Sequence, residues 1–167
     1  HTENPEAYHL YLKGRFFLNK LTLDGVRKAM QLFGQAIAID PAYALAYSGL
    51  VYCHLNLNDP VEARKAAIRA LELDSSLGEA HASLGFLMFL HDWDWRKAEV
   101  EFQRALELNP NFAQAHQWYA LYLAKMGRHE EAISEARRGE GLGPLALPMN
   151  PLHGHVLCFV PQFACAL

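Results

Sequence analysis

Cysteine is scarce in this sequence. Only three occur among 167 residues, at Cys53, Cys158 and Cys165, and no two of them are spaced as C-x-x-C. An odd number without paired spacing argues against a disulfide framework and against a cysteine-ligated zinc site. Such usage is typical of a reducing compartment, so we expect a cytoplasmic location.

Long apolar runs and a surplus of positive charge are missing as well. No run approaches the roughly 18–20 apolar residues that a membrane span needs, and the N-terminus lacks a signal-peptide pattern. The 15 basic and 18 acidic residues leave a net charge of −3 without a basic stripe. We therefore expect neither a membrane nor nucleic acid as a partner. With 51% hydrophobic and 20% charged residues, the composition is typical of a soluble globular protein.

Catalytic motifs are absent too. The sequence has no glycine-rich phosphate loop, no G-x-S-x-G elbow and no H-E-x-x-H. Pairs that look reactive, such as Cys53 with His54, are neighbours in a predicted helix, where adjacent residues do not face each other. We therefore expect no enzyme activity and no cofactor.

A period near 34 residues runs through the chain. The alanines Ala29, Ala63, Ala98 and Ala132 are separated by 34, 35 and 34 residues. Parallel columns keep the same register: Ala36, Ala70, Ala105 and Gly139; Ile39, Leu73, Leu108 and Leu142; Pro41, Ser75, Pro110 and Pro144. A fixed period of this length is the signature of a helical repeat architecture.

A second column holds small residues upstream in each unit: Gly14, Gly49, Gly85 and Ala120, followed by Gly154. Each lies within an apolar pattern of helical period, where a glycine costs about 1 kcal/mol relative to alanine. This cost, repeated at one position, indicates that two helices approach closely there. We expect the glycine of a first helix (helix A) to meet the alanines of a second (helix B).

Each unit therefore reads as helix A, turn and helix B, with no sheet. The predicted helix pairs are 5–20 and 23–39, 42–56 and 60–74, 78–91 and 94–108, and 112–126 and 128–140. Asn4-Pro5 and Asp59-Pro60 carry N-cap signals. The distance from the small residue to the first alanine falls from 15 to 12 residues along the chain. We assign this variation to the A–B turns, because a shift within a helix would rotate its packing face.

The columns resemble those of the tetratricopeptide repeat (TPR) family. The most specific stretch runs from Asp92-Trp93-Asp94-Trp95 through Ala98, Phe102 and Ala105-Leu106-Glu107-Leu108-Asn109-Pro110 to Trp118-Tyr119-Ala120. It is similar to the arrays appended to bacterial winged-helix regulators, protein kinases and nucleotide cyclases. The resemblance implies an all-α, right-handed superhelical solenoid of antiparallel hairpins, forming one domain over 1–167. Its units would be about 5–41, 42–77, 78–112 and 113–146, with a partial fifth at 147–167.

The resemblance implies protein–protein interaction, with a peptide or partner protein on a concave face lined by the A helices. Carried over by register, the expected lining is Tyr8, Tyr11, Arg15 and Asn19; Tyr43, Tyr47, Leu50 and His54; Glu79, Phe86 and Phe89; and Gln114, Gln117, Trp118, Leu121 and Lys125. Aromatic side chains at helical spacing are also typical of a core, and Phe86 and Phe89 could instead seal the space between hairpins. Only Arg15 and Lys125 are basic, so a carboxylate clamp is not expected.

The nine histidines raise the question of a metal site. His91, Asp92 and Asp94 could converge on a metal, but zinc needs three or four ligands in fixed geometry. One of the two aspartates is better explained as an N-cap. His81 and His116 occupy one repeat column, which indicates a packing role. We expect no metal site.

The C-terminal end is unusually apolar. Residues 156–160 and 163–167 are almost wholly apolar, and Pro161 interrupts the partial fifth unit before any helix B. We expect this end to contact another chain or further repeats, which makes a homo-oligomer possible. The chain reads as a piece of a longer protein, since it begins at His1 and ends on an apolar stretch. The resemblance to regulatory arrays implies that this longer protein is a bacterial sensor or regulator. Two alternatives remain open: a self-association module, and a substrate-recruiting segment of a larger enzyme.

Overall fold

The computed structural model describes residues 2–20 and 22–142, which form eight α-helices, one π-helical segment and no strand. This confirms the predicted all-α fold class, and the helix ends lie close to the predicted ones. The elements are α1 (Pro5–Leu18), α2 (Leu23–Ile39), α3 (Ala44–Asn56), α4 (Pro60–Leu73), α5 (Gly78–Leu87), η1 (Met88–Asp92), α6 (Trp95–Leu108), α7 (Ala113–Lys125) and α8 (His129–Gly141).

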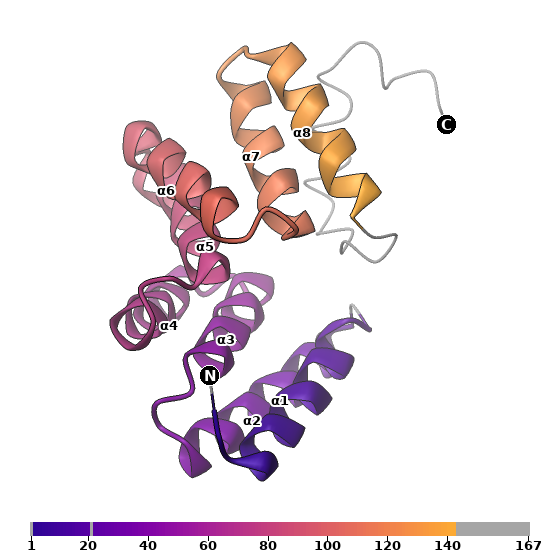
Figure 1. Cartoon of the computed structure of the whole chain (residues 1–167), viewed down its shortest axis with the longest axis vertical. Coiled ribbons are helices and arrows are strands. Elements are labelled where there is room, and N and C mark those ends of the chain that lie inside the picture. Colours follow the sequence, from indigo (N-terminus) through magenta and orange to yellow (C-terminus); the bar gives the residue numbers. More distant parts are fainter. Residues whose placement is uncertain (1, 21, 143–167) are drawn as a thin grey trace. The chain divides into compact units, whose positions relative to one another are not determined.

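Successive helices pair as four hairpins, each an A helix followed by a B helix: α1–α2, α3–α4, α5–α6 and α7–α8 (Figure 1). The chain divides into two compact units, His1–Asn109 and Pro110–Leu167. In the first unit, each B helix also packs on the next A helix, α2 on α3 and α4 on α5. Among the A helices, α3 is in lateral contact with both α1 and α5. The second unit contains the α7–α8 hairpin.

Four helices begin at a side chain that accepts a backbone N–H, and three of these caps, at Asn4, Asp59 and Asp94, were predicted from the sequence. The Asn4 side chain accepts from the backbone N–H groups of Glu6 and Ala7 at 2.9 and 3.1 Å. Asp59 accepts from Glu62 at 3.2 Å. Thr22 and Asp94 act in the same way for α2 and α6. Asp94 is therefore the aspartate that caps, while Asp92 pairs with Arg64 at 2.7 Å.

Three of the A–B turns share a left-handed residue: Asn58 (φ 56°), Trp93 (φ 57°) and Gly127 (φ 77°). After Asn58, the N–H of Asp59 donates to the carbonyl of His54 at 2.9 Å, which closes the end of α3. In the third hairpin the end of helix A widens into η1, and Asp94 N–H reaches back to the Met88 carbonyl at 3.2 Å. The length variation expected in the turn alone thus extends into the helix end here.

Trp93→Gly is expected to raise the free energy of unfolding by about 0.5–1 kcal/mol. A bulky side chain at positive φ is strained, and glycine removes that strain, although the freer unfolded chain takes back part of the gain. Trp93 is 73% exposed, so little burial is lost with its ring. Urea titration followed by circular dichroism measures the change. Asn58→Gly is the matched control and should gain less, because asparagine tolerates this conformation; a net loss for Trp93→Gly would show that its ring packing outweighs the strain.

The glycine column marks close helix contacts, as predicted. A Cβ at Gly85 would lie 3.1 Å from the Ala98 carbonyl oxygen, which places α5 directly on the backbone of α6. In the first hairpin the neighbour is a ring instead of an alanine. Cβ atoms at Gly14 and Gly49 would lie 2.5 and 2.7 Å from atoms of Phe33. The fully buried Phe33 of α2 therefore fills the space that glycines leave on both α1 and α3.

Some expectations lie outside the described residues: the partial fifth unit, Pro144, Gly154, Cys158, Cys165 and the apolar C-terminal segments. Within the described part of the chain, no helix is long and apolar enough to cross a membrane. The same residues contain no group of three or more His, Cys, Asp or Glu side chains that could hold a metal ion.

Candidate functional site: the face of the A helices

The A helices of the first unit carry an aromatic and basic cluster, formed by Tyr11, Arg15 and Tyr43. Arg15 Nη1 donates to Tyr11 Oη at 3.0 Å, and the guanidinium lies 5.9 Å from the centroid of the Tyr11 ring. The rings of Tyr11 and Tyr43 meet edge to face, with centroids 5.3 Å apart. These contacts hold Arg15 in one orientation while it remains exposed to solvent.

The Tyr43 hydroxyl is buried and has no hydrogen-bond partner among the described residues. Burial raises its pKa, and the nearby Tyr11, Tyr8 and Asp40 side chains raise it further. The phenol therefore stays protonated at any physiological pH and retains one donor. A buried donor without an acceptor costs roughly 1–3 kcal/mol, so an acceptor that reached it would be bound favourably.

Charges of opposite sign face each other across this surface. These are Arg15 on α1 and Glu79 on α5, and both charges act on the pKa of the neutral Tyr52 phenol of α3. Burial raises the pKa of Tyr52, Glu79 raises it further, and Arg15 opposes both. Glu79 also accepts a hydrogen bond from Asn109 Nδ2 at 3.2 Å. We call the surface formed by Tyr8, Tyr11, Arg15, Tyr43, Leu50, Tyr52, His54 and Glu79 the A-helix face.

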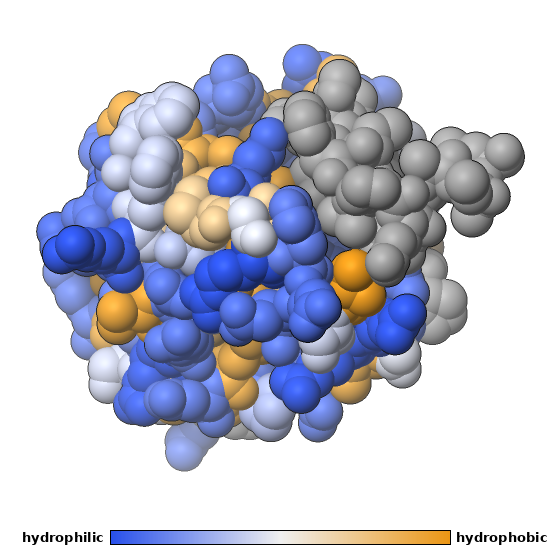
Figure 2. Space-filling view, turned by 90° about the horizontal axis from the view of Figure 1, so that it is seen from above, coloured by the Kyte–Doolittle hydropathy of each residue, from blue (hydrophilic) through white to orange (hydrophobic). Residues whose placement is uncertain are grey.

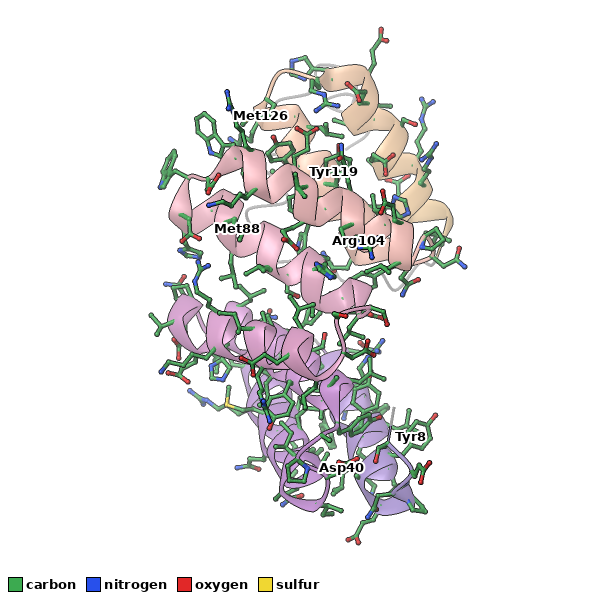
Figure 3. The ribbon with its side chains drawn as sticks, turned by 60° about the vertical axis from the view of Figure 1, so that its left-hand side comes forward. Tyr8, Asp40, Met88, Arg104, Tyr119 and Met126 are labelled. Atoms are coloured by element: carbon green, nitrogen blue, oxygen red, sulfur yellow. The ribbon has the colours of Figure 1, made fainter. Side chains whose placement is uncertain are left out.

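The structure exposes some of the predicted lining residues and buries others. Tyr8, Arg15, Asn19 and Lys125 are exposed, and Tyr8 points away from the ribbon of α1 (Figure 3). Leu50, His54, Glu79 and Gln117 are half-buried. Seven side chains expected to face solvent are instead buried: Tyr11, Tyr43, Phe86, Phe89, Gln114, Trp118 and Leu121. For Phe86, Phe89, Trp118 and Leu121 the packing interpretation of aromatic and apolar residues at helical spacing applies.

Tyr47 also differs from expectation. It packs against the apolar cluster of Ala44, Ala70 and Ala80, and its hydroxyl donates to the Pro41 carbonyl at 3.4 Å. Its side chain therefore lies toward α4 and the next hairpin and does not join Arg15 on the A-helix face. Tyr52 is the residue that takes part there, and sequence reasoning missed it because its column had no counterpart in the expected lining.

Two family models, both described as tetratricopeptide repeat, match residues 26–84 and 101–134, together more than half of the chain. The chain belongs to the tetratricopeptide repeat family. It is 28% identical over 133 residues to the transcriptional regulator HilA of Salmonella typhimurium, which covers 74% of this chain and 24% of HilA. The chain thus spans about a quarter or less of the length of the curated relatives it matches.

Solved structures of TPR proteins share this fold. TTC0263, a TPR protein of Thermus thermophilus, superposes with a TM-score of 0.67 and 21% identity, covering 93% of this chain and 84% of that one. The first TPR of Spaghetti (RPAP3), bound to an HSP90 peptide, superposes with a TM-score of 0.57 and 20% identity, covering 84% and 95%. At these identities the likeness shows the helical solenoid fold alone.

In two TPR units of this chain, the histidine of the same repeat column contacts a glutamate side chain and a backbone carbonyl. His81 Nδ1 lies 2.6 Å from Glu101 Oε2, and its Nε2 lies 3.1 Å from the Ser75 carbonyl oxygen. His116 repeats this with Glu135 at 2.6 Å and the Pro110 carbonyl at 2.9 Å. The predicted packing role therefore includes a cross-helix pair, in which each histidine joins helix A to helix B and to the loop before the hairpin.

The His81 pair predicts a dependence of stability on pH. The hydrogen bond to Glu101 raises the pKa of His81, against burial and the nearby Arg104, which lower it. Because the pKa of His81 is higher in the folded state, the His81–Glu101 pair adds to the free energy of unfolding. This stabilisation is fully present below the pKa of histidine in the unfolded chain, about 6.5, and is lost as the pH rises through the folded-state pKa. We expect the stability difference between wild type and His81→Gln to be largest below about pH 6 and to shrink as the pH rises through the folded pKa, as urea titrations would measure. His129→Gln, at the exposed start of α8, should show no such trend; an equal trend there would remove the Glu101 pair as the cause.

Proposed function

We propose that the chain is a protein–protein interaction scaffold that binds a peptide or a partner protein on its A-helix face. The observation that carries this proposal is the cluster in which Tyr11 and Tyr43 hold the exposed Arg15. Arginine and tyrosine are enriched among residues that dominate binding energy. An arginine already fixed by neighbours loses less conformational entropy on binding, which favours affinity.

The chemistry of the face indicates what a ligand must offer. Arg15 fits a carboxylate or a backbone carbonyl, the Tyr43 hydroxyl needs an acceptor, and Glu79 fits a donor or a basic group. Leu50 lies half-buried on α3 against the cluster of Val51, Ala63 and Leu87, and His54 lies 3.4 Å from Asp59, so the aromatic rings of Tyr8 and Tyr11 are the apolar part of the face. Arg15 is the single fully basic residue of the face, so a clamp for a strongly acidic tail is not the form of recognition that we propose. An extended peptide with mixed polar groups fits better.

Similarity supports this role and its context. The Spaghetti repeat is described as bound to an HSP90 peptide, and the solved protein YrrB as a TPR protein with an unusual peptide-binding site. The match to HilA supports a place in a bacterial transcriptional regulator. We further propose a cytoplasmic location and a single non-catalytic repeat domain over residues 1–167.

Arg15→Ala is expected to weaken peptide binding by about tenfold or more, since it removes the held guanidinium. The ligand is selected by panning a phage-displayed random peptide library on the wild-type chain, and its Kd is measured by fluorescence polarisation. Arg15→Lys should also lose affinity, because the ammonium keeps the charge but not the planar fork.

The matched control is Lys28→Ala, which removes an exposed basic residue on α2. It should leave Kd unchanged, and circular dichroism should show the same helicity for all variants. Selected peptides that bind Arg15→Ala as tightly as wild type, or that lose affinity with Lys28→Ala, would place recognition elsewhere.

A further inference from the structure

The outer side of α1 carries an exposed stripe of large apolar residues. Tyr8, Leu12 and Phe16 are 47%, 46% and 60% exposed, and they lie four residues apart, on successive turns of one helix face. The surface seen in Figure 2 is mostly hydrophilic, with hydrophobic residues in separate patches between polar ones. Large apolar side chains exposed on successive turns of one helix call for an explanation.

The repeat register shows what this side of an A helix does elsewhere. Phe16, Val51 and Leu87 each follow the column glycine of their helix by two residues. Val51 and Leu87 are fully buried, and Leu87 packs against Ala63, Ala66 and Ala67 of the preceding α4. In α1 the same position is open, because no hairpin precedes it in the described residues.

The neighbours of Phe16 do not suit the same kind of stacking. Five residues before the column glycine, α3 and α5 bury Ala44 and Ala80, whereas α1 has His9. One residue before it, α1 has Lys13 where α3 buries Ser48. Covering this side with an alanine-rich helix B would bury the Lys13 ammonium without a partner, which is costly.

The side is instead basic. From Tyr8 to Lys20 the sequence has two lysines outside the A-helix face, Lys13 and Lys20, and no acidic residue, in a chain of net charge −3. Lys20 Nζ lies 4.8 Å from the ring centroids of both Phe16 and Phe17. Within residues 2–20 and 22–142, neither Lys13 nor Lys20 forms an ion pair with a carboxylate. Charge and apolar area are thus both available on one helix side.

We propose that this basic–aromatic side of α1, formed by Tyr8, His9, Leu12, Lys13, Phe16 and Lys20, binds an acidic amphipathic helix of a partner protein. Apolar residues on successive turns match a second helix laid along α1, as α2 lies along α3. Acidic residues flanking its apolar face would pair with Lys13 and Lys20. Two lysines next to Glu3 and Glu6 are few for binding a nucleic-acid backbone, because that affinity grows with the number of phosphate contacts. Apart from the shared Tyr8, this site is separate from the A-helix face and its proposed peptide.

The probe is a fluorescein-labelled synthetic peptide with leucines at helical spacing and glutamates at the remaining positions. We expect it to bind the full chain in fluorescence polarisation, with an affinity that falls as salt rises. Phe16→Glu, and the double variant Lys13→Glu/Lys20→Glu, should each weaken binding by about tenfold or more. The matched control is Val100→Glu on α6, since Val100 is 62% exposed and outside the stripe. It should leave the affinity unchanged.

Several outcomes would overturn the proposal. These are no binding of the glutamate probe, equal binding of a lysine counterpart, or an affinity that the lysine reversals leave unchanged. Light scattering that shows a dimer of the wild type lost in Phe16→Glu would assign the stripe to a second copy instead. Tight binding of a duplex DNA of mixed sequence would assign it to nucleic acid. Peptides selected for the A-helix face should still bind Phe16→Glu, so the two proposed sites are tested independently. If Phe16→Glu does not fold, the Lys13→Glu/Lys20→Glu variant tests the proposal in its place.

Discussion

Phe33→Ala is expected to lower the free energy of unfolding by about 3–5 kcal/mol, the usual cost of emptying a buried aromatic position. Phe33 is fully buried, and its ring occupies the space left by Gly14 on α1 and Gly49 on α3. Its centroid also lies 5.8 Å from that of Tyr11. One side chain of α2 therefore connects three helices, and its loss opens a cavity that backbone glycines cannot fill.

Phe16→Ala is the matched control, because it makes the same chemical change at a position that is 60% exposed. It should cost within about 0.5 kcal/mol in urea titration. A double-mutant cycle adds a sharper test: Gly49→Ala should be costly in the wild type and nearly free once Phe33 is alanine. If Gly49→Ala were equally costly in both backgrounds, the ring would not be what excludes a Cβ at that position.

Much of this fold could be predicted because its determinants are local or periodic. Helix starts follow from side-chain caps such as Asn4 and Asp59, which act within three residues. The hairpin pairing follows from columns that keep one register. The glycine column predicted close helix contacts correctly, but it could not predict which side chain of helix B occupies the space beside each glycine. The corresponding column of helix B reads Phe33, Ala67, Phe102 and Ala136. The side chain in this column therefore varies in size, while the facing position in helix A stays small.

The candidate site was less predictable, because the repeat register gives the position of a residue within its unit but does not give how deeply its side chain is buried. Tyr43 and Tyr47 lie on the same stretch of chain, yet Tyr43 is buried beside Tyr11 and Tyr47 turns toward α4. Both are aromatic residues at helical spacing, and only the neighbouring helices distinguish their roles. Phe16 shows the converse. Its column is buried in α3 and α5, whereas Phe16 of α1 is 60% exposed.

A second large effect is expected at the alanine column of helix B. Ala105→Leu should lower the free energy of unfolding by about 1–3 kcal/mol, and by more if α6 cannot shift. Ala105 is fully buried, and its carbonyl oxygen would lie 2.9 Å from a Cβ at Gly78, so α5 and α6 approach to backbone contact here. Three added carbon atoms can be accommodated only by moving one helix away from the other or by an unfavourable rotamer.

The comparison that isolates this effect is Ala38→Leu on α2, where the alanine is exposed. Alanine and leucine differ little in helix propensity, so the control should stay within about 0.5 kcal/mol. Denaturant titrations of both variants give the difference directly. Gly78→Ala supplies an independent reading of the same contact, because it adds a Cβ from the opposite helix toward the Ala105 carbonyl. Two mild results at Ala105 and Gly78 together would mean that α5 and α6 are not in backbone contact, and that the repeat column records helix propensity rather than packing.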